Sequence, residues 1–185
     1  VAETSLTIDG VTVVIDSGLA RVPRFDPKRG LDRLELVRIS KASAEQRKGR
    51  AGRTAPGKCV RLWSSAEQNA MDDFETPEIQ RVDLAPVILN LRAWGTSDPK
   101  KFGWFEPPSN DRIDQAEKVL AMLGAIDGMH GPITPLGKEL ARLPVHPRIG
   151  RMLIEGARLG VMRDACSMAA LLSEKDIVRD DDAWQ

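Results

Sequence analysis

Tyrosine is absent from this 185-residue sequence, and aromatic residues make up only 4% of it. Proteins that hold single-stranded nucleic acid commonly stack successive bases on aromatic side chains. The composition therefore disfavours a binding surface built from aromatic platforms. If this chain contacts nucleic acid, charge and backbone contacts must supply most of the affinity.

Cysteine and histidine are also scarce, with two residues of each. Cys59 and Cys166 lie far apart without another Cys or His at metal-ligand spacing, so we expect both to be buried, reduced thiols of a cytoplasmic protein. Neither His130 nor His146 shows the pattern of a catalytic triad or a metal site, and we expect His146 to be structural. The sequence has no signal-peptide pattern and no apolar run near the ~20 residues that span a bilayer, so neither secretion nor membrane insertion is supported.

The formal net charge is zero, but the charges are unevenly distributed along the chain. Up to Arg61 there are 13 basic and 7 acidic residues, and the remainder has 14 basic and 20 acidic residues. A basic first third suits contact with phosphates, because clustered Arg and Lys release the counterions condensed on nucleic acid. A solvated basic face is the alternative.

The first third of the chain alternates short apolar runs with turn-forming residues, which predicts α/β structure. The expected strands cover residues 11–15, 19–25, 31–39 and 58–63, and the first of these should be buried. The second and third should form a β-hairpin, because the intervening Asp-Pro-Lys-Arg-Gly at 26–30 favours a tight reversal. A helix is expected from Ser43, which forms a capping-box pattern with Gln46, to about Arg53.

After residue 76 the apolar spacing becomes helical. The expected helices cover about residues 84–94, 113–123 and 135–143, followed by two more after Pro147. Trp94 falls on the apolar face of the first, so we assign it to the core. Ile126 and Ile133 flank a turn at Asp127-Gly128, which fits a small winged-helix unit.

The stretch QRKGRAGR at residues 46–53 is the most informative part of the sequence. On a continuous helix Gln46, Arg50 and Arg53 would lie at i, i+4 and i+7, and so on one face. Two glycines cost a helix interior roughly 1 kcal/mol each relative to Ala, which a simple surface helix has no reason to carry. Neighbouring arginines also repel each other unless an anion lies between them, and a nucleoside triphosphate would serve. A solvated basic helix is the alternative.

This stretch resembles motif VI of the superfamily 2 helicases, whose pattern is Q-R-x-G-R-x-G-R, and every fixed position matches. The resemblance implies that Arg50 and Arg53 are arginine fingers that reach the γ-phosphate of ATP. It implies that Gln46 helps to position the hydrolytic water. These three residues would thus be both catalytic and nucleotide-binding, whereas Arg47 would tie the motif to neighbouring elements.

Residues 2–10, AETSLTIDG, resemble motif V of the DEAH-box branch of the same superfamily. By that resemblance Asp9 approaches the bound nucleotide. Motif V and the hairpin that follows it would contact nucleic acid, although a helix cap and a solvated hairpin are the alternatives. The nucleic-acid-binding residues that this implies are Thr4, Ser5, Thr7, Arg21, Arg24, Lys28 and Arg29.

The later helices resemble the winged-helix and ratchet domains that follow the motor domains in this family. The stretches ITPLG at 133–137 and LPVHP at 143–147 are most similar to the bacterial HrpB-type helicases. The implied fold class is α/β plus α. The implied domains are the C-terminal part of a second RecA-like domain (1–76), a winged-helix-like domain (77–144) and the start of a helical ratchet domain (145–185).

The resemblance implies an ATP-dependent RNA helicase that moves along RNA or single-stranded DNA and uses ATP with Mg²⁺. The sequence contains no G-x-x-x-x-G-K-[ST] loop and no D-E-A-H tetrad, so the first RecA-like domain of the same full-length chain would supply them. We therefore expect the present sequence, a fragment, to bind no cofactor and to be inactive by itself. A non-enzymatic nucleic-acid-binding or regulatory module is the alternative function.

Overall fold

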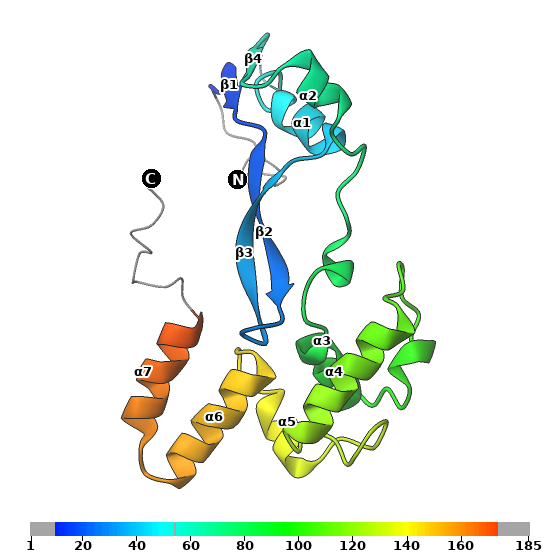
Figure 1. Cartoon of the computed structure of the whole chain (residues 1–185), viewed down its shortest axis with the longest axis vertical. Helices are drawn as coiled ribbons and strands as arrows, with labels where there is room; N and C mark the ends of the chain where they lie inside the picture. The colour runs from blue at the N-terminus through cyan, green and yellow to red at the C-terminus, as the bar shows by residue number, and fades with distance from the viewer. Residues whose placement is uncertain (1–9, 54, 174–185) are drawn as a thin grey trace. The chain divides into compact units, whose positions relative to one another are not determined.

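The computed structural model describes residues 10–53 and 55–173, which form two compact units divided between Val82 and Asp83 (Figure 1). The first unit contains β1 (Val13–Asp16), β2 (Leu19–Asp26), β3 (Leu31–Arg38), α1 (Lys41–Lys48), β4 (Lys58–Arg61), α2 (Ser65–Asn69) and the 3-10 turn η1 (Glu78–Gln80). The second contains α3 (Ala85–Ala93), the 3-10 turn η2 (Pro99–Lys101), α4 (Asn110–Met122), α5 (Pro135–Leu140), α6 (Pro147–Arg158) and α7 (Met162–Ser173). The α/β plus α class is therefore confirmed.

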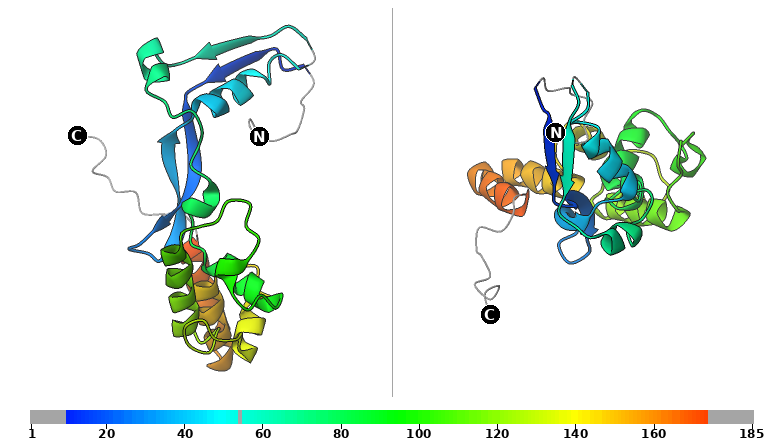
Figure 2. Two further views of the ribbon diagram at one scale, coloured as in Figure 1. Left: turned by 90° about the vertical axis from the view of Figure 1, so that its right-hand side faces the viewer. Right: turned by 90° about the horizontal axis from the view of Figure 1, so that it is seen from above.

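A parallel pair of strands packs against α1 in the first unit. β1 and β4 pair from Val13 opposite Lys58 to Asp16 opposite Arg61, and α1 lies along one face of the pair (Figure 2). Val13 and Ile15 point to the other face and are 56% and 70% exposed. The expectation of a buried strand was wrong for this face, because no described residue of the first unit covers it.

The predicted hairpin is confirmed. β2 and β3 pair antiparallel from Leu19 opposite Arg38 to Asp26 opposite Leu31. The reversal between them closes with a hydrogen bond of 2.8 Å from the Gly30 N–H to the Asp26 carbonyl. Gly30 has φ of +67°, a left-handed conformation that glycine adopts without steric cost. The turn therefore forms where the Pro and Gly pattern placed it.

Close backbone packing fixes the segment that joins α1 to β4. Ala51 is buried in this segment, and Gly57 passes so close to it that a Cβ on Gly57 would lie 1.9 Å from the Ala51 carbonyl oxygen. Only glycine fits at such a separation. Gly57 thus holds residues 50–53 against the start of β4.

The second unit has a helical core with a small turn attached to it. Ile88 of α3, and Ile113 and Leu120 of α4, are almost completely buried. After α4, Ile126 and Ile133 form an isolated antiparallel bridge around the turn, as a wing requires. This bridge agrees with the winged-helix expectation. The pair α6 and α7 follows as a helical hairpin.

Trp94 is not a core residue. Its side chain is 82% exposed, whereas Leu84 and Leu91 on the same predicted face are buried. The assignment was wrong because α3 ends at Ala93 and Trp94 takes the capping position, followed by Gly95 with φ of +97°. The apolar periodicity therefore continues in the sequence beyond the packed part of the helix.

A buried charged network links α3, α4 and the turn after α4. The Arg92 guanidinium is hydrogen-bonded to the Glu117 carboxylate, and the two side chains are 4% and 1% exposed. His130 contacts the other oxygen of the same carboxylate from a backbone with φ of +62°. Both charges are thus removed from water, and each depends on its partners for compensation.

Breaking this network should destabilise the second unit. Arg92→Met leaves the Glu117 carboxylate buried with His130 alone, and we expect the free energy of unfolding to fall by about 3–5 kcal/mol. The double variant Arg92→Met/Glu117→Leu should recover much of that loss, because neither charge remains in the core. Urea unfolding followed by circular dichroism measures the effect. Glu155→Gln, which weakens partly exposed pairs with Arg151 and Arg158, is the control and should change little. Wild-type stability in Arg92→Met would contradict this account.

Gly57→Ala should destabilise the first unit, because the added Cβ meets the Ala51 carbonyl at 1.9 Å. We expect a loss of about 1–3 kcal/mol, the usual cost of overpacking. The control is Gly52→Ala in the same segment, since a Cβ there has no neighbour within 4 Å. Thermal unfolding of both variants tests this prediction. Equal melting temperatures for the two variants would show that the backbone relaxes without cost.

Candidate functional site

The helix predicted to carry residues 46–53 is shorter than expected. α1 begins at Lys41 with Ser40 as its N-cap, and the Ser40 hydroxyl accepts a 3.1 Å hydrogen bond from the Ser43 N–H. It ends at Lys48, with Gly49 as the C-cap. The predicted start at Ser43 was therefore two residues late, because Ser40 rather than Ser43 caps the helix.

Gln46, Arg50 and Arg53 do not share one helical face, and this expectation was wrong. Gln46 lies in the last turn of α1 and is exposed, whereas Arg50 and Arg53 lie in the non-helical segment that follows the end of α1. Glycines at 49 and 52 disfavour continuation of the helix, which explains the early end. The structure still brings the three residues into one short segment, with Arg50 half-buried and Arg53 exposed.

Arg47 points toward the strands and anchors α1 there, as expected. Its Nη1 lies 3.0 Å from Asp16 Oδ1 and donates a second 3.0 Å hydrogen bond to the Leu19 carbonyl. Asp16 Oδ1 also accepts a 3.0 Å hydrogen bond from the Gly18 N–H. Asp16 was not identified from the sequence, because no local pattern pairs a strand-end carboxylate with an arginine 31 residues later.

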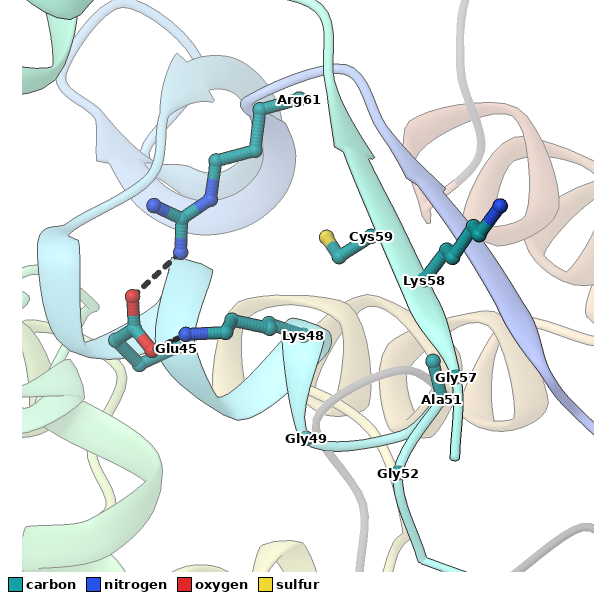
Figure 3. Close-up of a pocket in the computed structure, with 9 residues that line it drawn as sticks. All are labelled: Glu45, Lys48, Gly49, Ala51, Gly52, Gly57, Lys58, Cys59 and Arg61. Carbon is teal, nitrogen blue, oxygen red and sulfur yellow. Dashed lines mark hydrogen bonds and ion pairs between the residues drawn. The ribbon is translucent and has the colours of Figure 1, made fainter. Parts of the chain in front are cut away.

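A cavity of about 470 Å³ opens between α1 and β4 (Figure 3). Residues from both elements and from the connecting segment line it, among them Glu45, Lys48, Cys59 and Arg61. The proposed catalytic residues 46, 50 and 53 are not part of this lining. Other residues of the same stretch, Lys48, Gly49, Ala51 and Gly52, line the cavity instead.

Glu45 pairs with two of the three cations that line this cavity. Arg61 Nη2 lies 2.6 Å from Glu45 Oε1, and Lys48 Nζ lies 3.1 Å from Glu45 Oε2. The hydrogen bond from Arg61, together with that from Lys48, lowers the pKa of the Glu45 carboxyl below its usual value. The ionised carboxylate is paired with Arg61 and Lys48, and Lys58 is the third cation of the lining.

The basic residues predicted on the hairpin divide between its two faces. Arg24 lies 3.3 Å from Glu35, and Arg33 lies 3.0 Å from the same carboxylate, so this face is largely neutralised. Arg21 is on the opposite face of β2, is exposed, and pairs across the hairpin with the exposed Leu36. Lys28 and Arg29 are exposed in the turn. The four predicted residues therefore do not form one continuous basic surface.

The motif V residues Thr4, Ser5, Thr7 and Asp9 lie outside the described residues. Their predicted contacts with nucleic acid and nucleotide remain predictions. The first described residue of this region, Gly10, has φ of +81° and leads directly toward β1.

One group of possible metal ligands occurs among the described residues. The ligand atoms of Asp114, Glu117 and His130 lie within 4.8 Å of one another. The sequence showed no metal-site pattern around His130, so this grouping was not predicted. Lys100 Nζ lies 2.6 Å from Asp114, and Arg92 is paired with Glu117, so both carboxylates already have cationic partners. This arrangement is explained as an ion-pair network without a metal.

His146 is structural, as predicted. Its Nε2 lies 3.2 Å from Asp83 Oδ2, and its Nδ1 accepts a 3.2 Å hydrogen bond from the Arg148 N–H. Burial opposes ionisation of Asp83, but hydrogen bonds from His146 and from the Ala85 N–H outweigh it and lower the pKa of Asp83. This pair ties the start of α3 to the start of α6.

The cysteine expectation was wrong in part. Both thiols are free, but Cys166 is exposed on α7 and Cys59 is only half-buried beside the cavity. Apolar neighbours in sequence did not predict burial, because the apolar residues around Cys166 are themselves partly exposed on α7. Among the described helices, none has the length and apolar character needed to cross a membrane.

Two family models match the second unit. Residues 116–145 match the winged-helix part of the helicase-associated domain HA2, and residues 146–183 match its ratchet-like part. The first match contains the Ile126–Ile133 bridge, and the second contains α6 and α7.

Known proteins match nearly the whole chain. The pre-mRNA-splicing factor ATP-dependent RNA helicase prp22 of Schizosaccharomyces pombe is 44% identical over 96% of this chain, and the ATP-dependent RNA helicase HrpA of Escherichia coli is 42% identical over 95%. The crystal structure of the Escherichia coli DEAH/RHA helicase HrpB superposes with a TM-score of 0.79 at 37% identity, covering 96% of this chain.

These relatives are much longer than the present sequence. The chain spans 15% of the prp22 helicase, 14% of HrpA and 22% of the HrpB chain. The matches begin well before the HA2 region, so they include the segment with the hairpin and residues 46–53. Over nearly its whole length the chain therefore matches a part of the DEAH-box ATP-dependent RNA helicases that includes the HA2 domain.

Proposed function

We propose that this chain supplies the arginine-finger half of the ATPase site of a helicase. The proposal rests on residues 46–53, which match the Q-R-x-G-R-x-G-R pattern at every fixed position. They span the end of α1, where Arg47 is bonded to Asp16 and Gly57 packs closely against Ala51. Arg50 and Arg53 extend from that fixed segment rather than from a regular helix. Such a segment can place two guanidinium groups against an anion with little loss of conformational entropy.

The proposed chemistry is phosphoryl transfer from ATP to water. Arg50 and Arg53 would stabilise the charge that develops on the γ-phosphoryl oxygens, a role for which a planar, permanently charged group is suited. Gln46 would orient the attacking water, and Asp9 would contact the nucleotide. The phosphate loop and the Mg²⁺ ligands would come from the first RecA-like domain of the same full-length protein, because the present sequence has neither motif.

The proposed substrate is single-stranded RNA, since the matched relatives are named RNA helicases. Thr4, Ser5 and Thr7 would contact the sugar-phosphate backbone, which positions a strand without reading its sequence. On the hairpin the proposed contacts are Arg21, Arg24, Lys28 and Arg29, of which Arg24 shares its charge with Glu35. The domain boundaries proposed from the sequence, after residues 76 and 144, remain part of this proposal.

Arg53→Ala in a full-length helicase that contains this sequence should reduce RNA-stimulated ATP hydrolysis by on the order of 10³-fold, because the transition state loses a guanidinium. Steady-state turnover at saturating RNA measures the effect. Fluorescent-nucleotide binding and thermal unfolding should stay close to the wild-type values.

The matched control is Lys48→Gln, which changes an exposed cation of the same motif that is paired with Glu45. Its turnover should stay within about twofold of wild type. If Arg53→Ala turns over ATP as fast as Lys48→Gln does, the arginine-finger proposal fails and the motif is structural in this protein.

The purified 185-residue chain should show no Mg²⁺-dependent ATP hydrolysis above background, because it contains neither a phosphate loop nor a DEAH tetrad. A phosphate-release assay with and without single-stranded RNA measures this. Turnover that depends on Mg²⁺ and disappears in the Arg53→Ala chain would show that the ATPase site is complete in this sequence, contrary to the proposal.

A further inference from the structure

We propose that the Asp16–Arg47 bridge is a positioning element that transmits movement of the hairpin to the segment bearing Arg50 and Arg53. The inference rests on the proposed function, because it assigns the bridge a part in coupling nucleic-acid binding to ATP hydrolysis. Arg47 would act through α1 and would not touch the nucleotide.

The bridge is buried and has several hydrogen bonds. The side chains of Asp16 and Arg47 are 2% and 12% exposed, and Arg47 Nη1 lies 3.0 Å from Asp16 Oδ1. Asp16 Oδ1 also accepts the Gly18 N–H at 3.0 Å, which fixes the carboxylate to the β1–β2 turn. A charged pair shielded from water is weakly screened and sensitive to the position of each partner.

Arg47 joins α1 to the root of the hairpin as well as to β1. Its Nη1 donates to the carbonyl of Leu19, the first residue of β2, at 3.0 Å. Gly18, directly before Leu19, accepts a 3.0 Å hydrogen bond from the Ile39 N–H, so the outgoing and returning strands are tied together at this level. The guanidinium therefore binds both the end of β1 and the first residue of β2, where the hairpin leaves the strand pair.

The polypeptide itself provides a second connection between the same elements. Only Ile39 and Ser40 separate β3 from α1, and they are 2% and 3% exposed. Ser40 is also the N-cap of α1. Because both residues are buried and hydrogen-bonded, β3 continues into α1 through a constrained junction.

The two connections hold α1 near both of its ends. The Ser40 junction fixes the N-terminus, and Arg47 fixes the last turn, one residue before the C-terminal Lys48. Rotation of the hairpin about its root would then move α1 as a unit together with residues 49–53. Without the Arg47 contacts, the C-terminal turn of α1 would be released from the hairpin while the N-terminal junction remained.

The test uses a full-length helicase that contains this sequence, with ATP hydrolysis measured with and without saturating single-stranded RNA. In Arg47→Gln and in the nearly isosteric Asp16→Asn, we expect the ratio of stimulated to basal turnover to fall about tenfold, within the usual range of coupling between sites. Basal turnover should fall by less than stimulated turnover, whereas the KM for ATP and the Kd for RNA should stay within about twofold of wild type. Arg47→Lys keeps the charge and one donor, so it should retain more of the stimulation than Arg47→Gln.

Hydrogen exchange gives a direct structural readout on the same proteins. RNA binding should change the exchange of the amides of residues 44–49 in the wild type and should leave them unchanged in Asp16→Asn. Lys48→Gln, whose side chain pairs with Glu45, serves as the control and should respond like the wild type. If Arg47→Gln does not fold, the same measurements on Asp16→Asn still test the inference.

Three outcomes would overturn the inference. The first is unchanged stimulation in both bridge variants, and the second is a parallel loss of basal and stimulated turnover, which would indicate a general structural role. The third is an RNA-dependent change in α1 exchange that persists in Asp16→Asn. If the wild-type enzyme hydrolyses ATP without any response to RNA, the proposed function itself fails, and that result is separate from the behaviour of the variants.

Discussion

The contact between Asp16 and Arg47 determines how the first unit is organised. It joins the end of β1, the root of the hairpin and the last turn of α1 through hydrogen bonds that are all close to 3.0 Å. A buried carboxylate and guanidinium tolerate little displacement, because each charge loses solvation that only the partner replaces. The positions of Gln46 before the helix end, and of Arg50 and Arg53 after it, follow from this anchor.

Much of the fold could be predicted from local sequence patterns. The hairpin formed where a Pro and Gly turn separates two apolar-rich segments, and Thr134-Pro135 begins α5 with the Thr134 hydroxyl as its cap. The Ile126–Ile133 bridge also formed around the predicted turn. These features depend on backbone conformation and on residues close in the sequence, which is why single-sequence reasoning reaches them.

The errors arose where tertiary contacts or helix ends decide the outcome. Helical periodicity placed residues 46, 50 and 53 on one face, but two glycines and the Gly49 cap end α1 before Arg50. The same reasoning buried Trp94, although α3 ends one residue before it. The network of Arg92, Glu117 and His130 could not be predicted, because its members are up to 38 positions apart and each is polar. The partner of Arg47 escaped prediction for the same reason.

Similarity to DEAH-box RNA helicases extends over nearly the whole chain, whereas the roles proposed for individual residues rest on the motif resemblance, geometry and chemistry. The central claim is that the segment after α1 contacts the transferring phosphoryl group. The most direct measurement is a structure of a full-length helicase containing this sequence with ADP, Mg²⁺ and aluminium fluoride bound. The account predicts guanidinium nitrogens of Arg50 and Arg53 about 3 Å from the fluoride ligands, the spacing of charge-assisted hydrogen bonds. Both guanidiniums lying out of hydrogen-bonding reach of the nucleotide in that complex would contradict it.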